Sequence, residues 1–206
     1  MSELAPLTEV YERNERGPSP SFTAAHLVLA FLVIGDSETV GRQALAAQAG
    51  LGDGAVRTVL KKLKAAGFLK VNASGCSLSG GGRRLYRRVR AKLVGVVPLE
   101  HSPFTIGSRQ AAMLVKKGGA LVHSGIEQRD SAMRVGASGA TTYVVRGSRF
   151  TVPGGSSDCE KDFPNPVWRK LRTDLSPEEG DALVLCGSDD PKKSQLGAIA
   201  AALTLA

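Results

Sequence analysis

The spacing of apolar residues along the chain predicts a series of short helices and strands. Residues 53–66 show a clear helical pattern, because apolar side chains recur there at intervals of three and four residues. Residues 68–72 alternate like a short strand, and residues 140–152 turn at Gly147-Ser148 like a hairpin. The whole pattern predicts helices over 24–34, 41–49, 53–66, 80–94, 124–135, 167–171 and 191–203, and strands over 68–72, 76–78, 111–116, 140–146, 149–152 and 182–186.

These elements indicate an α+β protein with two domains, an arrangement for which 206 residues are sufficient. Residues 1–22 are polar and interrupted by prolines, so we expect a flexible N-terminal arm. Residues 23–95 form the first domain, in which helices precede a hairpin and a further helix. Residues 96–206 alternate strands with helices and form a mixed α/β domain.

Glycine and aspartate mark the ends of the helices in the first domain. Gly50 is placed to cap the end of the second helix, and Gly67 ends the third. Asp53 begins the third helix as its predicted N-cap, where a carboxylate would accept hydrogen bonds from the free N–H groups of the first turn. The sequence therefore predicts that a tight turn at residues 51–53 joins the second and the third helix.

The helix over residues 53–66 has two different faces. Its apolar face holds Val56, Val59, Leu60 and Leu63, which we expect in the core. The opposite face begins with small residues and continues with donors, a composition that suits close approach to a DNA groove. This face consists of Gly54, Ala55, Arg57, Thr58, Lys61 and Lys64.

Positive charge is concentrated in the same region. Residues 41–95 contain twelve Lys or Arg residues and one acidic residue, Asp53, whereas the whole chain has a net charge of only +8. From residue 96 onward the charges balance, with thirteen basic and twelve acidic residues. A basic stripe on a helical scaffold is typical of nucleic-acid binding. A protein-docking surface and RNA binding are the alternatives, and the one-sided charge favours DNA.

Two segments of the basic region are similar to a known domain. RQALAAQAGLGDGAVRTVLKKLKAAGFLKV has the order helix, turn, helix, strand, and CSLSGGGRRLYRRV supplies a second strand and a following helix. Together they resemble the winged helix-turn-helix domains of bacterial and archaeal transcription regulators. The resemblance implies double-stranded DNA as the partner and a homodimer. In this interpretation Arg57, Thr58 and Lys61 contact bases, and the phosphate contacts come from Lys62, Lys64, Arg83, Arg84 and Arg87.

Three segments of the second domain are candidates for a small-molecule site. In GSDDP a strand gives way to a helix, whose free N–H groups could bind an anion, although Asp190 before Pro191 is also a good helix cap. GASGATT is a glycine-rich turn, and EQRD places Asp130 at the i,i+4 spacing of a surface pair with Arg134. The candidate ligand-binding residues are Glu127, Arg129, Asp130, Ser138, Thr141, Thr142, Ser188, Asp189 and Asp190.

Other classes of function find little support in the sequence. Cys76, Cys159 and Cys186 are far apart and lack metal-ligand spacing, so we expect a reduced cytoplasmic protein with no metal and no cofactor. The apolar run 24–34 is too short to cross a bilayer, and the acidic N-terminus is unlike an export signal. No catalytic constellation is identified, although convergence of acidic residues in an enzyme remains an alternative.

The segments SGIEQRDSAMRVGASGATT and GSDDPKKSQLGAIAAALTLA resemble the C-terminal domain of a family of uncharacterised archaeal proteins. In that family a winged helix precedes a domain of unknown function, and the resemblance implies a cytoplasmic archaeal protein. The leading hypothesis is a DNA-binding transcriptional regulator whose C-terminal domain senses a small molecule or mediates dimerisation. The alternative is an enzyme that acts on a nucleotide or cofactor precursor and carries an appended winged helix. An architectural nucleic-acid binder without any ligand is a third hypothesis.

Overall fold

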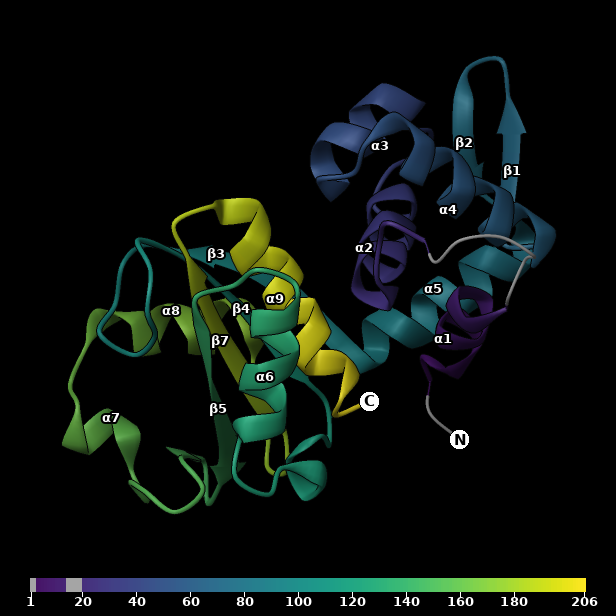
Figure 1. Cartoon of the computed structure of the whole chain (residues 1–206). Coiled ribbons are helices and arrows are strands. Elements are labelled where there is room, and N and C mark those ends of the chain that lie inside the picture. Colours follow the sequence, from purple (N-terminus) through teal and green to yellow (C-terminus); the bar gives the residue numbers. More distant parts are fainter. Residues whose placement is uncertain (1–2, 14–19) are drawn as a thin grey trace. The chain divides into compact units, whose positions relative to one another are not determined.

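The computed structural model describes residues 3–13 and 20–206. The chain divides into two compact units, Met1–Arg90 and Ala91–Ala206, which are described separately below. Both units combine helices with strands, which confirms an α+β protein (Figure 1).

The N-terminal unit consists of helices that precede and follow a two-stranded hairpin. The strands β1 and β2 pair antiparallel, with Leu69 opposite Leu78, and Val40 adds a bridge to Cys76 at the edge of this hairpin. The predicted order of helices and hairpin is confirmed. The elements are α1 (Ala5–Glu12), α2 (Ala24–Gly35), α3 (Arg42–Ala49), α4 (Asp53–Ala65), β1 (Leu69–Asn72), β2 (Gly75–Leu78) and α5 (Gly80–Lys92).

The α3–α4 turn forms for local reasons, one of which differs from the prediction. Gly50 adopts the left-handed conformation (φ 66°) that ends α3, as predicted. Asp53, however, is the first residue of α4 rather than its cap. Gly52 occupies the cap position in extended conformation, and no side chain caps the helix there. The Asp53 carboxylate is therefore available for other partners.

The prediction of a flexible arm over residues 1–22 is wrong for residues 3–13, while residues 1–2 and 14–19 lie outside the described part. Residues Ala5–Glu12 form α1, whose side chains Leu7 and Val10 are buried together with the preceding Leu4. Pro6 falls in the first turn of this helix, where its missing N–H leaves no hydrogen bond unmade. A proline that appears to break structure thus begins a helix that packs on the unit.

The C-terminal unit is built on a five-stranded sheet with the order β3-β4-β7-β5-β6 and antiparallel pairing throughout. The strand β3 was not predicted. It follows α5 directly, so the units divide after Arg90 rather than near residue 95. The elements are β3 (Leu93–Leu99), β4 (Arg109–Val115), the 3-10 helix η1 (Gly119–Leu121), α6 (Ile126–Arg134), β5 (Gly139–Arg146), β6 (Arg149–Thr151), α7 (Cys159–Asp162), α8 (Pro166–Leu175), β7 (Ala182–Ser188) and α9 (Pro191–Leu203).

The two faces of this sheet are covered by different helices. β7 is central and buried along its whole length, and its side chains alternate between the faces. Leu183 and Leu185 belong to a core cluster with Leu171 and Trp168 of α8. α9 and α6 pack on the other face, against β4, β7 and β5 (Figure 1). The sheet is therefore the middle layer of a three-layer unit.

Candidate functional site

Most of the predicted DNA-binding residues lie on the exposed face of α4. Val56, Val59 and Leu63 are fully buried, so the helix can turn only its other side to solvent. A Cβ atom added at Gly54 would meet no atom within 4 Å. The start of α4 therefore offers open space to an approaching partner. The exposed residues of this face, here called the α4 face, are Gly54, Arg57, Lys61 and Lys64, with Ala55 and Thr58 half-buried beside them.

An acidic residue links this face to the start of α3. Asp53 Oδ1 lies 3.0 Å from Arg42 Nε, and Asp53 Oδ2 lies 2.7 Å from Arg57 Nη2. All three side chains are about half exposed, and exposed pairs of this kind contribute only about 0.2–1 kcal/mol. Asp53 therefore holds two guanidinium groups side by side, while a phosphate could replace it at little cost.

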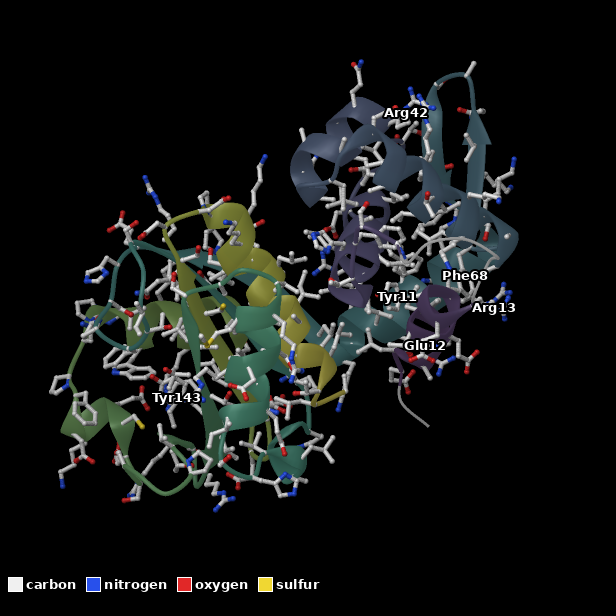
Figure 2. All side chains as sticks on the ribbon, in the orientation of Figure 1. Tyr11, Glu12, Arg13, Arg42, Phe68 and Tyr143 are labelled. Atoms are coloured by element: carbon white, nitrogen blue, oxygen red, sulfur yellow. The ribbon has the colours of Figure 1, made fainter. Side chains whose placement is uncertain are left out.

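Arg42 was not among the predicted site residues. It is the first residue of α3 and its side chain projects from the α3 side of the unit (Figure 2). A basic residue at the start of the helix that precedes the predicted DNA-binding helix is a signal that could have identified it. Lys70 is exposed on β1 of the hairpin and was likewise not predicted.

Thr58 keeps part of its hydrogen-bonding capacity. Its Oγ1 donates to the carbonyl of Gly54 at 3.1 Å, within the helix itself. The hydroxyl proton is thereby used, and the oxygen can still accept a hydrogen bond. Thr58 is accordingly suited to contact a base amino group or to pack its methyl group.

The structure corrects the predicted phosphate contact at Lys62. This side chain is 9% exposed and lies on the buried side of α4. Its Nζ donates to the carbonyl oxygens of Val10, Tyr11 and Arg13 at 3.4, 3.1 and 2.6 Å. Those carbonyls end α1, where a cation also interacts favourably with the helix dipole. Lys62 thus fastens α1 to α4, and Figure 2 labels Tyr11 and Arg13 at this end of α1.

The basic helix α5 is only partly available to a ligand. Arg88 Nε lies 2.6 Å from Glu3 Oε2, and Arg90 is paired with Asp36, which also accepts a hydrogen bond from Tyr86. Acidic residues from the first forty positions therefore neutralise part of the charge that is concentrated in the sequence. The three predicted phosphate contacts on this helix are exposed: Arg83, Arg84 and Arg87.

Within the unit, α5 and α4 offer separate surfaces. α5 leaves the base of the hairpin and lies on the side of the unit away from α3 and the hairpin tip (Figure 1). Its buried residues Leu85 and Val89 face inward, and Gly35 of α2 lies against the ring of Tyr86. The cations of α5 therefore form a second basic surface rather than an extension of the α4 face.

The predicted ligand-binding residues do not meet in one site. Ser138 N donates to Gly187 O at 2.8 Å, so Ser138 lies at the same end of the sheet as the residues that follow β7. Thr141 donates to Phe104 O at 2.6 Å on one sheet face, whereas Thr142 is buried and its Oγ1 has no hydrogen-bond partner among the described residues. The remaining predicted residues divide between the exposed side of α6 (Glu127, Arg129 and Asp130) and the end of β7 (Ser188, Asp189 and Asp190).

The polar groups of these two places have local partners. Asp130 pairs with Arg129 at 3.1 Å, where an i,i+4 pair with Arg134 was predicted. Asp190 caps α9, because its Oδ1 accepts from Lys192 N at 2.9 Å, as predicted. Asp189 accepts hydrogen bonds from the backbone N–H and the hydroxyl of Ser108, and these bonds lower the pKa of its carboxyl. The arrangement at the end of β7 therefore stabilises the loop and helix there.

Two kinds of site are not found in the described part of the chain. Over residues 3–13 and 20–206, no group of three or more His, Cys, Asp or Glu side chains is placed to hold a metal ion. Among the same residues, no helix combines the length and the apolar character needed to cross a bilayer.

Comparison with known proteins gives a match to a family model over part of the chain and similarity to a solved structure. Residues 106–205 match the model of the family described as Domain of unknown function (DUF4443). The solved structure of the hypothetical protein PH0730 from Pyrococcus horikoshii OT3 is similar, with a TM-score of 0.73 and 22% sequence identity over 90% of this chain and 93% of that chain. At this identity the likeness concerns the fold alone. No curated protein matches the chain.

Proposed function

We propose that this protein is a DNA-binding transcriptional regulator in which the α4 face enters the major groove of double-stranded DNA. The observation that carries the proposal is the composition of that face: open space at Gly54, then Arg57, Lys61 and Lys64 along one side of the helix. The major groove of B-DNA admits an α-helix, and Arg and Lys pair with guanine edges or neutralise phosphates.

In this proposal, cations on both sides of α4 contact the phosphate backbone of the DNA. Arg42 at the start of α3 and Lys70 on the hairpin flank the helix in the fold. Phosphate contacts of this kind fix the position of a protein on the duplex and make its affinity depend on salt. Binding by the α4 face with these flanking residues predicts a steep fall of affinity with ionic strength.

The C-terminal unit senses a small molecule or mediates dimerisation in the same proposal. A homodimer would place two α4 helices about 34–36 Å apart, which is one turn of DNA. The predicted cations of α5, which lie on a separate surface, would then contact phosphates only if the duplex bends toward them or a second unit presents them.

The proposal is tested by fluorescence anisotropy with random genomic double-stranded DNA fragments and a matched RNA pool at several salt concentrations, followed by sequencing of the retained fragments. We expect DNA binding with an enriched sequence motif. Arg57→Glu should abolish it, while the matched charge reversal Arg169→Glu on exposed α8 should not. Arg87→Glu tests the α5 surface separately. Equal loss in all three variants, preference for RNA, or no binding at low salt would refute the proposal, and DNA binding without an enriched motif would favour an architectural role.

A further inference from the structure

We propose that the C-terminal unit binds a small molecule that has a planar aromatic body and an anionic group, on the sheet face covered by α8. The proposal concerns a different place from the residues predicted from sequence. It does not depend on DNA binding, and its test contains no DNA.

An apolar cavity of about 550 Å³ lies on this face. Its volume falls within the range of about 300–1,000 Å³ that is usual for small-molecule sites. Most of its walls are aromatic or aliphatic, so a ligand that enters it must be largely apolar. The lining residues that matter here are Phe104, Tyr143, Val152, Cys159, Phe163 and Trp168.

The aromatic side chains of the cavity wall pack against one another. The centroids of Phe104 and Trp168 are 4.5 Å apart, and Tyr143 meets Trp168 edge-on at 5.3 Å. Trp168 Nε1 donates to the carbonyl of Phe163 at 2.9 Å, so the indole offers only its apolar surface to the cavity. Phe163 itself is 56% exposed at the rim. Offset and edge-to-face contacts of such rings add to the burial of apolar area.

One polar group of the cavity has no partner. Tyr143 is only 3% exposed, and its hydroxyl, which is not among the fully buried polar atoms without a partner, lies at the cavity wall with no hydrogen bond to residues 3–13 and 20–206. Burial raises the pKa of this hydroxyl, with a smaller contribution from Cys159, so the group remains protonated and can donate. A hydroxyl at a cavity wall that has no acceptor in the described protein can donate to a group that enters the cavity. A ligand oxygen or ring nitrogen in the cavity would accept this hydrogen bond.

A second concavity, of about 540 Å³, shares the Val152 wall with the first. Its lining combines Arg146 and Arg149 with the loop Pro153–Ser157. Arg146 and Arg149 lie opposite each other in the hairpin register, and both are exposed. Asp158 lies 3.5 Å from Arg149 and takes up part of its charge. In the described chain, Arg146 has no acidic partner.

The loop beside these arginines presents backbone donors. Gly155 N donates to Val152 O, whereas the N–H groups of Gly154, Ser156 and Ser157 make no hydrogen bond to the described residues. Free backbone N–H groups in a glycine-rich turn form an anion-binding concavity, and Arg strengthens it with charge-assisted bonds. An anionic group on the aromatic ligand would therefore lie over Val152 toward Arg146.

The chain contains a single tryptophan, so the fluorescence of Trp168 reports directly on this cavity. The full-length protein would be titrated with adenosine 5′-monophosphate, adenosine, phenylacetate, phenylacetamide and inorganic phosphate, none of which emits in the tryptophan band. We expect saturable changes in emission with one or both aromatic anions. Their affinity should exceed that of the matching neutral compound by about tenfold or more, the effect of a hydrogen bond to a charged group. Preference for the nucleotide or for the carboxylate identifies the source of the anion.

Two variants separate the two parts of the site. Arg146→Ala should lower the affinity for the aromatic anions by about tenfold and leave the affinity for the neutral compounds unchanged. Arg134→Ala on exposed α6 is the matched control. Tyr143→Phe should lower the affinity for both the charged and the neutral compounds. An unchanged emission spectrum of this variant without ligand shows that its core is intact. Absence of saturable binding by every probe, or equal affinities of charged and neutral compounds in the native protein, would overturn the proposal.

Discussion

Replacing Lys62 with methionine tests whether this lysine belongs to the structure or to the DNA contact. Methionine has a similar length but no donor, so the carbonyl oxygens of Val10, Tyr11 and Arg13 lose their shared partner. Only the bond to Val10 is buried, and the other two carbonyls can regain water.

The magnitude follows from these contacts. One buried acceptor without a partner costs about 1–3 kcal/mol, and the loss of a cation at a helix C-terminus costs about 0.3–1 kcal/mol. With partial losses at the two outer carbonyls, the free energy of unfolding of the N-terminal unit should fall by about 2–4 kcal/mol. α1 has eight residues, too few to be stable alone, so it should detach first.

Hydrogen exchange of the α1 amides and urea unfolding measure this effect. Lys64→Met, two residues further along the same helix on its exposed face, is the control and should change neither measurement. The salt dependence of DNA binding, recorded where both variants are folded, gives an independent readout. The log–log slope should stay unchanged for Lys62→Met and become shallower by about one for Lys64→Met. Unchanged α1 protection with a shallower slope for Lys62→Met would refute the reasoning and restore Lys62 as a phosphate contact.

Three further predictions follow from local geometry. Burial lowers the pKa of His26 from its ordinary value of 6.5, and the unprotonated Nδ1 accepts a hydrogen bond from Thr23 N at 3.1 Å. The free energy of unfolding should therefore fall as the pH drops below about 6.5, and His26→Gln should remove that dependence. Identical urea midpoints of the native protein at about pH 5 and pH 7 would contradict this prediction. Gly54→Leu should leave thermal stability unchanged or raised, since Leu is a better helix former and no atom lies within 4 Å of the added Cβ. The same substitution should weaken DNA binding about tenfold or more, through a clash with the duplex of about 1–3 kcal/mol. Undiminished DNA binding would show that α4 does not enter the groove. Gly197→Ala should destabilise the C-terminal unit by about 1–3 kcal/mol, because the new Cβ would lie 2.5 Å from Cys186 Sγ and 2.8 Å from Ala137 Cβ. Unfolding in urea, followed by Trp168 emission, measures this loss of stability. An unchanged midpoint would mean that α9 moves to make room for the methyl group.

The sequence by itself determined the elements whose signals are local. The last helix runs from Pro191 to Leu203 as predicted, because Asp190 caps it and proline begins it. The β5–β6 hairpin turns at Gly147-Ser148, where both residues have positive φ angles. The apolar spacing of α4 fixed which of its faces is buried, and thereby placed Arg57 and Lys64 on the outside. Each of these signals depends on residues within a few positions of one another.

Only the tertiary structure decided features that depend on distant partners. A lysine is compatible with an exposed or a buried position, and Lys62 became a helix cap because α1, some fifty positions earlier, supplies three carbonyl groups. α1 in turn is too short to form without that packing. The aromatic cavity combines Phe104, Tyr143 and Trp168, which are separated along the chain and meet only when the sheet and α8 assemble. Periodicity records which side of an element is buried, but long-range contacts decide what each buried or exposed side chain meets.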